Sequence, residues 1–256
     1  MSNAKSANNL AGPNLSIEPP VINLDNAHLT LGTDATAVHI LKGISLQIAA
    51  GETVGVLGPS GAGKTSLLMV MSGLENLSKG RMHLAGIDIT TMGEDQLAAL
   101  RRDKVGIVFQ AFRLIPSMTA TQNVAIPLEL AGRDDATQAA EAALKSVGLG
   151  HRLTHYPDQM SGGEQQRVAI ARAIAGERRL LLADEPTGNL DLASAAEVLE
   201  LFRSLCADPE RGMSILLVTH DPDLASKADR MLLLRDGQTV ASDIRSAWGL
   251  EEGEEE

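Results

Sequence analysis

The chain has 256 residues, of which 44% are hydrophobic and 21% are charged, and its formal net charge at pH 7 is −11. This length supports one large or two small domains with a sizeable core. The acidic balance argues against a general nucleic-acid binder, which needs basic surface, and an aromatic content of 2% leaves little from which to build stacking platforms for single-stranded nucleic acid.

The ends of the chain, its apolar runs and its cysteine content indicate the cellular compartment of the protein. Residues 1–20 are rich in Asn, Ala, Ser and Pro and lack the basic patch and apolar core of a secretory signal, so we interpret them as a disordered leader. Residues 246–256 form an acidic tail. Nowhere do apolar residues continue for the roughly 18 positions that a membrane-spanning helix needs. The single Cys206 excludes an internal disulfide and is typical of a reducing compartment, so we expect a cytoplasmic protein.

Between these ends the sequence alternates between predicted strands and predicted helices. Short apolar runs typical of strands lie at Val21–Leu24, Ile40–Ile48, Glu52–Leu57, Val105–Phe109, Leu180–Ala183 and Ser214–Val218. Helical patterns lie at Ser66–Met71 and Asp95–Arg102, and residues 111–160 look mostly helical, which indicates a helical insertion. The first two runs predict a small β layer. The later ones, with helices before, between and after them, predict a parallel sheet covered on both faces and therefore the α/β class.

A glycine-rich loop joins the predicted strand at residues 52–57 to the helix that follows it. The loop matches the phosphate-loop pattern G-x-x-x-x-G-K-[ST] in the context that this pattern requires. Glycines let consecutive backbone N–H groups point at phosphate oxygens, and the helix adds its positive N-terminal end. Lys64 is expected to reach the β- and γ-phosphates of a nucleotide, and Thr65 to offer its hydroxyl to Mg²⁺. The nucleotide-binding residues predicted here are Gly58, Pro59, Ser60, Gly61, Ala62, Gly63, Lys64, Thr65 and Ser66.

Two adjacent carboxylates follow the predicted strand at residues 180–183. The tip of a parallel strand can face the phosphates, so Asp184 is predicted to hold Mg²⁺. Glu185 points differently and is placed to polarise an attacking water, which is a general-base role. A phosphate loop does not by itself name a reaction, because kinases, GTPases, helicases and transport ATPases all use one.

The segment Met160–Arg167 carries a further motif. Its sequence, Met-Ser-Gly-Gly-Glu-Gln-Gln-Arg, resembles the signature motif of ATP-binding cassette (ABC) ATPases and leads into a predicted helix that begins at Gln165. Ser161 and the N–H groups of Gly162 and Gly163 stand at a helix N-terminus, where they can hold a phosphate. The resemblance implies that this phosphate belongs to the ATP of a second copy of the chain.

The resemblance covers nearly all of residues 21–240 and implies further site residues. Gln110 matches the family's Q-loop, Asp191 its D-loop and His220 its switch histidine. Gln110 is thereby implied to complete contacts to Mg²⁺ and water, Asp191 to communicate across a dimer, and His220 to touch the γ-phosphate and orient the water. The implied fold is a RecA-like P-loop NTPase core with an N-terminal antiparallel β subdomain and the helical insertion, which together form one ABC ATPase domain over residues 21–245.

Three positions depart from the family pattern. Met160 and Glu164 replace the usual Leu and Gln of the signature, and we expect both exchanges to be tolerated. Leu31 takes the place of the aromatic residue that usually stacks on adenine, which predicts weak binding of the base. His39 offers a partial ring surface, although an outward-facing strand histidine is the simpler interpretation.

Within the ABC ATPases, residues 105–116 and 123–128 resemble the subgroup that serves lipoprotein release, macrolide export and related cell-envelope work. This resemblance implies a dimeric ATPase bound to an integral membrane permease, peripheral on the inner face of the cell membrane. Apolar side chains beside Gln110 are suited to receive a helix of the permease, and they are also suited to a core. They are Phe109, Phe112, Leu114, Ile115, Pro116 and Met118.

Two other functions compete with this one. A soluble ABC ATPase of DNA repair, translation or metal-cluster assembly usually has two cassettes, a long coiled-coil insertion or a basic surface, whereas this chain has one cassette, no heptad run and a charge of −11. A GTPase or small-molecule kinase is disfavoured because the sequence lacks an Asn-Lys-x-Asp motif to read guanine. The transported substrate and the direction of transport stay open.

Overall fold

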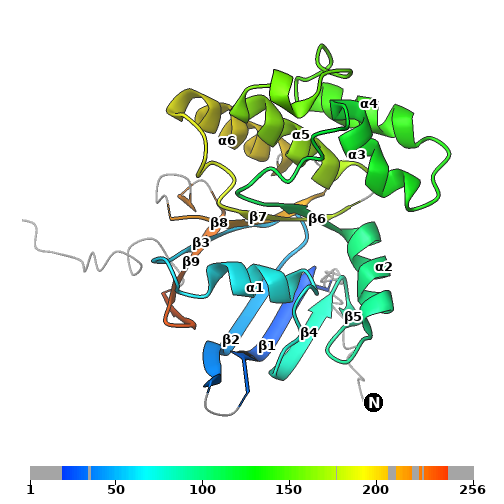
Figure 1. The fold of residues 1–256 in the computed structure, drawn as a ribbon. Coiled ribbons are helices and arrows are strands. Elements are labelled where there is room, and N and C mark those ends of the chain that lie inside the picture. The colour runs from blue at the N-terminus through cyan, green and yellow to red at the C-terminus, as the bar shows by residue number, and fades with distance from the viewer. Residues whose placement is uncertain are drawn as a thin grey trace, which may run out of the picture.

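The computed structural model describes residues 19–33, 36–176, 178–206, 212–220, 225–226 and 228–241. Of the predicted leader, only residues 19 and 20 fall within these ranges, and the predicted acidic tail at 246–256 lies outside them. The described chain builds two sheets with helices packed on them (Figure 1).

Two β-sheets organise the fold. The smaller sheet is antiparallel with the strand order β2-β1-β4-β5, and the larger has the order β10-β9-β3-β8-β7-β6. In the larger sheet, β3, β6, β7 and β8 run parallel, as the apolar runs predict. The strands are β1 (Ile22–Leu31), β2 (Val38–Ile48), β3 (Thr53–Leu57), β4 (Lys79–Leu84), β5 (Ile87–Asp88), β6 (Val105–Val108), β7 (Leu180–Asp184), β8 (Ser214–Val218), β9 (Arg230–Arg235) and β10 (Gln238–Ala241).

Helices cover the larger sheet on both faces (Figure 1). On the side of the antiparallel sheet lie α1 (Lys64–Met71) and α2 (Glu94–Lys104), and the opposite lobe holds α3 (Ala120–Glu129), α4 (Ala136–Ser146), α5 (Gly162–Ile174) and α6 (Leu192–Cys206). Along β7, Leu180 and Leu182 pack toward the first side, and Leu181 and Ala183 toward the lobe. Because both faces are buried, such a strand is a continuous apolar run. Among the described residues, no helix has the length and apolar character to cross a membrane.

Two β-hairpins differ from the sequence prediction. The β4–β5 turn contains Ala85 and Gly86, with φ of 50° and 78°, and the β9–β10 turn contains Asp236 and Gly237, with φ of 49° and 75°. Two consecutive residues with positive φ are typical of type I′ hairpin turns, for which Asp-Gly is a strong sequence signal. Residues 230–241 form this second hairpin, which the sequence analysis does not include.

The segment 111–160 is less helical than predicted. It holds α3, α4 and a short 3₁₀ turn, Pro157–Gln159, whereas residues 111–119 form a loop. Asn123 of α3 is fully buried and fastens this loop. Its Oδ1 accepts from the Ile115 N–H at 2.7 Å, and its Nδ2 donates to the carbonyl oxygens of Ile115 and Met118 at 3.1 and 3.0 Å. A buried amide therefore fixes the path of the loop in place of helical hydrogen bonds.

Candidate active site

The carboxyl ends of the parallel strands bring four segments to one edge of the sheet. Val218 of β8 is paired with Val56 of β3 on one side and with Asp184 of β7 on the other. The segments that follow these strands line a cleft of about 530 Å³, a size typical of small-molecule sites. Its lining residues are Ile40, Ser60, Gly61, Gly63, Lys64, Thr65, Ser66, Gln110, Asp184, Glu185 and His220.

The glycine-rich loop after β3 has a backbone path that requires glycine. Gly61 and Gly63 have φ of 78° and 99°, in the left-handed region, and Gly63 is the N-cap of α1. Lys64 is buried, and its Nζ donates to the carbonyl oxygens of Gly58 at 2.7 Å and Pro59 at 3.1 Å. The loop therefore holds its cation at the cleft. Three predicted loop residues do not line the cleft, namely Gly58, Pro59 and the buried Ala62.

Asp184 ends β7 at the floor of the cleft and is 8% exposed. Its Oδ2 accepts a hydrogen bond from Thr65 Oγ1 at 2.9 Å, and its Oδ1 has no hydrogen-bond partner in the described part of the chain. Burial raises the pKa of Asp184, and the hydrogen bond from Thr65 offsets part of that shift. A carboxylate oxygen without a partner, next to a hydroxyl, is a donor set that suits Mg²⁺.

Glu185 occupies an uncommon backbone conformation just beyond the strand. Its φ is 45°, in the left-handed region that non-glycine residues rarely adopt, and its N–H donates to the Val218 carbonyl at 2.8 Å. Its Oε1 lies 3.3 Å from His220 Nδ1 and 3.9 Å from Lys64 Nζ. Strained residues of this kind cluster at functional sites, and here the strain places a carboxylate between a histidine and a lysine.

Gln110 reaches the same cleft from the end of β6. Its carbonyl oxygen accepts a hydrogen bond from Asn189 Nδ2 at 3.0 Å, and a Cβ added to Gly188 would lie 3.0 Å from its Nε2. The loop after Glu185 therefore packs directly on Gln110. Asn189 is not among the predicted site residues, because a loop asparagine carries no signal for a contact with a distant segment.

The predicted signature residues do not line this cleft. Ser161 is exposed and is the N-cap of α5, where its Oγ accepts from the Glu164 N–H at 3.2 Å. Glu164 in turn accepts from the Ser161 N–H at 2.9 Å, which completes a capping box. The helix therefore begins at Gly162 rather than at Gln165, the start that the sequence predicts.

Gly163 and Asp191 meet at Ser194 of α6. A Cβ added to Gly163 would lie 2.9 Å from the Cβ of Ser194, so this position requires glycine. Asp191 accepts from the Ser194 N–H at 3.0 Å and from its Oγ at 2.8 Å. Gly163 and Asp191 therefore meet at Ser194, away from the cleft, although Ser194 itself is not among the predicted residues.

The residues considered for the adenine base lie on the antiparallel sheet. Leu31 pairs with Val38 at the ends of β1 and β2 and is 42% exposed. His39 Nδ1 lies 2.9 Å from Thr30 Oγ1 on the exposed face, as an outward-facing strand histidine should. Ile40 lines the cleft instead. Successive side chains of a strand point to opposite faces, so an outward-facing His39 predicts that its neighbour Ile40 faces the other way.

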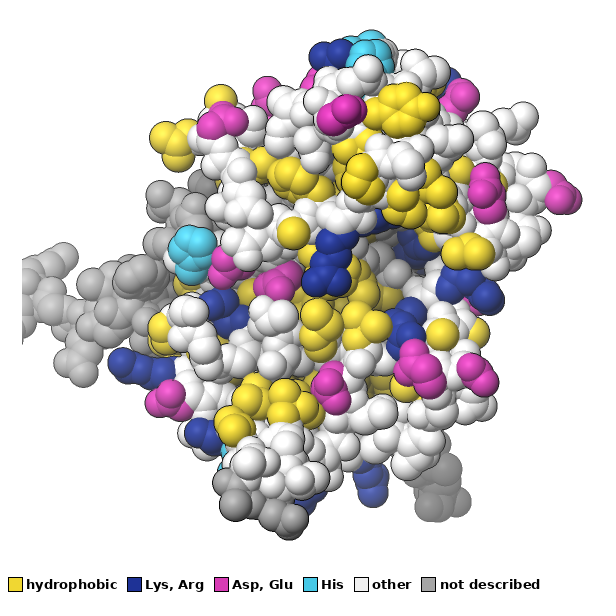
Figure 2. Space-filling model, in the orientation of Figure 1, with side chains coloured by type: hydrophobic (Ala, Val, Ile, Leu, Met, Phe, Trp, Pro, Cys, Tyr) yellow, Lys and Arg dark blue, Asp and Glu magenta, His cyan; other side chains and the backbone are white. Residues whose placement is uncertain are grey.

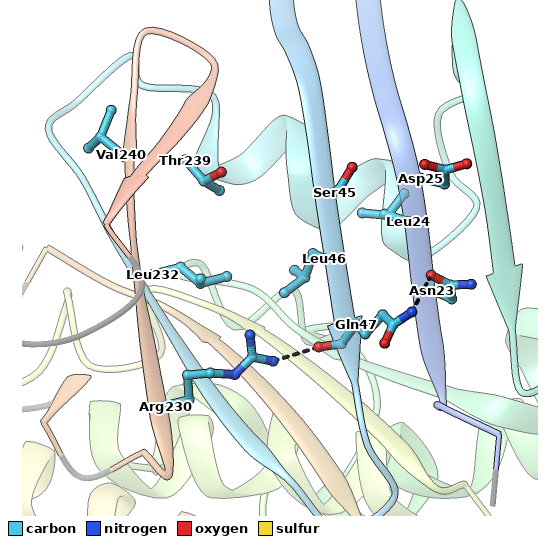
Figure 3. Close-up of a pocket in the computed structure, with 10 residues that line it drawn as sticks. All are labelled: Asn23, Leu24, Asp25, Ser45, Leu46, Gln47, Arg230, Leu232, Thr239 and Val240. Carbon is cyan, nitrogen blue, oxygen red and sulfur yellow. Dashed lines mark hydrogen bonds between the residues drawn. The ribbon is translucent and has the colours of Figure 1, made fainter. Parts of the chain in front are cut away.

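A second hollow, of about 760 Å³, lies between β2 and the β9–β10 hairpin (Figure 3). Arg230 in this hollow is already engaged, because it donates to Glu52 at 2.8 Å and to the Gln47 carbonyl at 2.5 Å. The lining residues are Asn23, Leu24, Asp25, Ser45, Leu46, Gln47, Arg230, Leu232, Thr239 and Val240. The predicted site residues lie elsewhere, so size alone does not make this hollow the active site.

The predicted docking patch beside Gln110 lies on the loop before α3. Figure 2 shows hydrophobic side chains gathered over the upper lobe and along the boundary below it. Of the patch residues, Pro116 is exposed, and five are half-buried, namely Phe109, Phe112, Leu114, Ile115 and Met118. Arg113 lies over the Phe109 ring, 4.0 Å from its centroid. The patch is thus partly core and partly accessible surface.

Comparisons with known proteins agree on one family. A family model described as ABC transporter matches residues 41–188. The lipoprotein-releasing system ATP-binding protein LolD of Geobacter metallireducens is 46% identical over 212 residues, which are 82% of this chain and 93% of LolD. The macrolide export ATP-binding/permease protein MacB of Rhodopirellula baltica is 48% identical over 210 residues, which are 80% of this chain but 30% of MacB. A solved dimeric ATP-binding cassette, in a post-hydrolysis state bound to ADP and Pi, has a TM-score of 0.79 at 36% identity and covers 87% of this chain and 97% of that one.

Proposed function

The chain belongs to the ABC transporter family, and on that basis we propose that it is the ATP-binding and ATP-hydrolysing component that energises a membrane permease. We place it on the inner face of the cell membrane, in export or cell-envelope transport. The names of the LolD and MacB relatives support this role, although the chain spans about a third of the length of the MacB relatives. One observation carries the proposal: a single cleft is lined by four predicted site residues, Lys64, Asp184, Glu185 and His220.

Each polar group of the cleft has a distinct part in ATP hydrolysis. The N–H groups of the glycine-rich loop bind phosphate oxygens, and Lys64 contacts the β- and γ-phosphates. Glu185 accepts a proton from the attacking water. His220, 3.3 Å from Glu185, contacts the γ-phosphate and orients that water. Lys64 is already held by the carbonyl oxygens of Gly58 and Pro59, which lowers the cost of positioning its charge during the reaction.

Mg²⁺ fits the oxygen atoms at the floor of the cleft. Asp184 offers a buried oxygen that has no partner in the described ranges, and the Thr65 hydroxyl lies beside the other oxygen. Gln110 offers an amide oxygen from the neighbouring loop. Bound at these residues, Mg²⁺ would neutralise negative charge on the β- and γ-phosphates.

A second copy of the chain would complete each site. Ser161, Gly162, Gly163 and Asp191 do not line their own chain's cleft, and Ser161 is exposed at the N-terminus of α5, where backbone N–H groups attract anions. Facing the ATP of the other copy, this end of α5 contacts its γ-phosphate. ATP then favours a closed dimer and hydrolysis reopens it, because the phosphate contacts exist only in the closed state. The dimeric relative bound to ADP and Pi supports this arrangement.

The permease docks on the half-buried patch beside Gln110. An amphipathic helix of the permease can bury its apolar face against the exposed parts of these side chains. Asn189 links the Gln110 backbone to the loop that follows Glu185. A helix bound at the patch would therefore contact a segment that reaches the catalytic carboxylate.

The replacement Glu185→Gln tests the proposed function. It removes the proton acceptor but keeps the shape of the side chain, so we expect turnover to fall by roughly 10²–10⁴-fold while ATP binding persists. An ATP-bound dimer should then accumulate in size-exclusion chromatography. Glu200→Gln, at an exposed position of α6, is the matched control and should hydrolyse ATP like the parent protein. Undiminished hydrolysis in the Glu185→Gln protein would refute the role of Glu185.

The same variant tests the link to transport. Tagged Glu185→Gln protein, incubated with ATP and detergent-solubilised membranes of its own cell, should retain a polytopic membrane protein that mass spectrometry identifies. Retention of soluble proteins or nucleic acid alone would contradict the transport role.

A further inference from the structure

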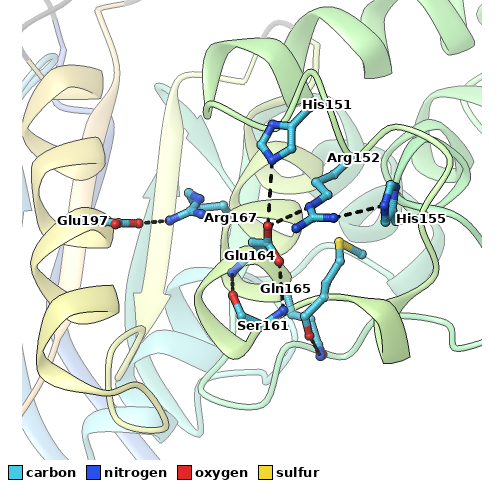
Figure 4. A network of polar contacts seen from close by, with 9 residues as sticks. His151, Arg152, His155, Ser161, Glu164, Gln165, Arg167 and Glu197 are labelled. Atoms are coloured by element: carbon cyan, nitrogen blue, oxygen red, sulfur yellow. Dashed lines mark hydrogen bonds and ion pairs between the residues drawn. The ribbon is translucent and has the colours of Figure 1, made fainter.

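A network of polar side chains surrounds the cap of α5 (Figure 4). Glu164 is its centre, because Oε2 accepts from the Ser161 N–H at 2.9 Å and Oε1 accepts from Arg152 Nε at 2.8 Å. Arg152 lies in the turn that follows α4, and its Nη1 lies 3.0 Å from His155 Nε2. His151 Nε2 is 4.0 Å from the same carboxylate. One carboxylate thus connects the signature serine to an arginine.

Glu164 brings a negative charge to this end of the helix. Burial acts to raise its pKa, but hydrogen bonds from the Ser161 N–H and from Arg152 lower the pKa below its ordinary value. The side chain is 13% exposed, so water screens the charge poorly. The charge also lies directly at the exposed Ser161, 2.9 Å from its backbone nitrogen, where the triphosphate of the other copy is proposed to bind. An unopposed carboxylate there would repel that triphosphate.

We propose that Arg152 is a positioning residue that cancels the charge of Glu164 and so allows the signature end of α5 to receive ATP from a second copy. This inference rests on the proposed ATP-bridged dimer. Glu164 supplies the geometry of the cap, since its Oε2 orients Ser161, and Arg152 supplies the opposite charge at Oε1. The pair leaves the cap ordered and electrically neutral.

Other contacts hold α5 in place independently of Arg152. Gln165 Nε2 donates to the carbonyl oxygens of Pro157 at 2.9 Å and Met160 at 3.1 Å, which fastens the turn before the signature. Arg167 forms an ion pair with Glu197 of α6. A variant that lacks Arg152 should therefore fold with its signature helix docked, so a change in its behaviour reports the lost charge.

A charge cycle tests the proposal in the full chain. Arg152→Gln, Glu164→Gln and the double variant are each placed in Glu185→Gln protein, and light scattering gives the ATP concentration for half-maximal dimer. Arg152→Gln leaves one unopposed negative charge and should raise this concentration by roughly 10-fold, whereas Glu164→Gln leaves a positive charge and should lower it. The double variant restores neutrality and should return close to the parent. Added salt should narrow the difference between Arg152→Gln and the parent.

Controls separate this role from a merely structural one. Arg203→Gln removes an arginine that lies 3.0 Å from Glu200 on α6, and it should leave the dimer unchanged. The proposal is overturned if the double variant is as impaired as Arg152→Gln, or if salt has no effect on that impairment. A Glu185→Gln parent that forms no dimer with ATP would overturn the proposed function as well, so the two failures are distinguishable.

Discussion

Two carboxylates close to the proposed phosphate positions are built in opposite ways. In the cleft, burial raises the pKa of Asp184, and one of its oxygens has no partner among the described residues. At the cap of α5, both oxygens of Glu164 accept hydrogen bonds, and its pKa is lowered. Asp184 is therefore an acceptor that awaits a cation, whereas Glu164 is satisfied within its own chain.

The difference between the two regions fits their proposed tasks. The proposed task of the cleft is to bind nucleotide. It contains an Asp184 oxygen without a partner among the described residues and a strained Glu185 backbone, and a bound ligand can compensate for both. The signature end of α5 only has to present an ordered, uncharged surface to a nucleotide that another chain holds. Substitutions in the two regions should therefore affect binding, dimerisation and stability in different combinations.

The largest effect on dimer formation is expected from Ser161→Arg. A long cation at the exposed cap of α5 blocks close approach of the second copy, so we expect hydrolysis to fall by roughly 100-fold or more. ATP binding by the single chain should persist because Ser161 does not line the cleft. Light scattering and the binding of a fluorescent ATP analogue measure the two properties separately. Loss of ATP binding by the monomer would show that the signature acts within its own chain.

A smaller effect is expected on thermal stability, where removing the Asp184 charge and removing the Glu164 charge should shift the Tm in opposite directions. Because burial raises the pKa of Asp184, its charge opposes folding once the pH exceeds the ordinary value of 3.8. Asp184→Asn should therefore raise the nucleotide-free Tm at neutral pH by roughly 2–4 °C while it abolishes hydrolysis. Differential scanning calorimetry without nucleotide or Mg²⁺ is the measurement.

Glu164→Gln is the matched comparison in the other region. The lowered pKa of Glu164 stabilises the fold above its ordinary value of 4.5, and that stabilisation is lost as the pH falls through the lower, folded value. The substitution should therefore lower the Tm at neutral pH. The comparison fails if both substitutions shift the Tm in the same direction.

The smallest effect is expected for Leu31→Tyr. Leu31 is 42% exposed, so the exchange removes little packing and adds a ring at the position predicted from the sequence to lie beside adenine. Stacking on a base should tighten ATP binding by roughly 5-fold, as isothermal titration calorimetry of the monomer would show. An unchanged Kd would mean that Leu31 does not lie beside the base.

The cleft was the easier region to predict from sequence. Its residues follow apolar strands, and the ends of parallel strands share one edge, so Lys64, Asp184 and Glu185 are predicted from local pattern. His220 lines the same cleft, but only the family resemblance pointed to it. The hairpin at Asp236 and Gly237 had a local signal as well, which the prediction passed over.

The second region depends on contacts between distant segments. Nothing in the sequence around Ser194 predicts that it packs on Gly163, and nothing around Arg152 predicts that it binds Glu164. Such pairs follow from how α5 docks on its neighbours, which no periodicity encodes. The leader, the tail and the limits of the domain at 21–245 stay predictions.

The central claim is that each ATP site takes its cleft from one chain and its signature from another. Mixing two impaired variants tests it directly, one with Ser161→Ala, which removes the signature hydroxyl without adding bulk between the chains, and the other with Lys64→Ala. A mixed dimer then contains one site whose cleft and signature are both intact. Hydrolysis in the mixture should recover to about a quarter of the wild-type rate, because half of randomly formed dimers are mixed and each has one intact site. A rate no higher than the sum of the separate variants would contradict the claim.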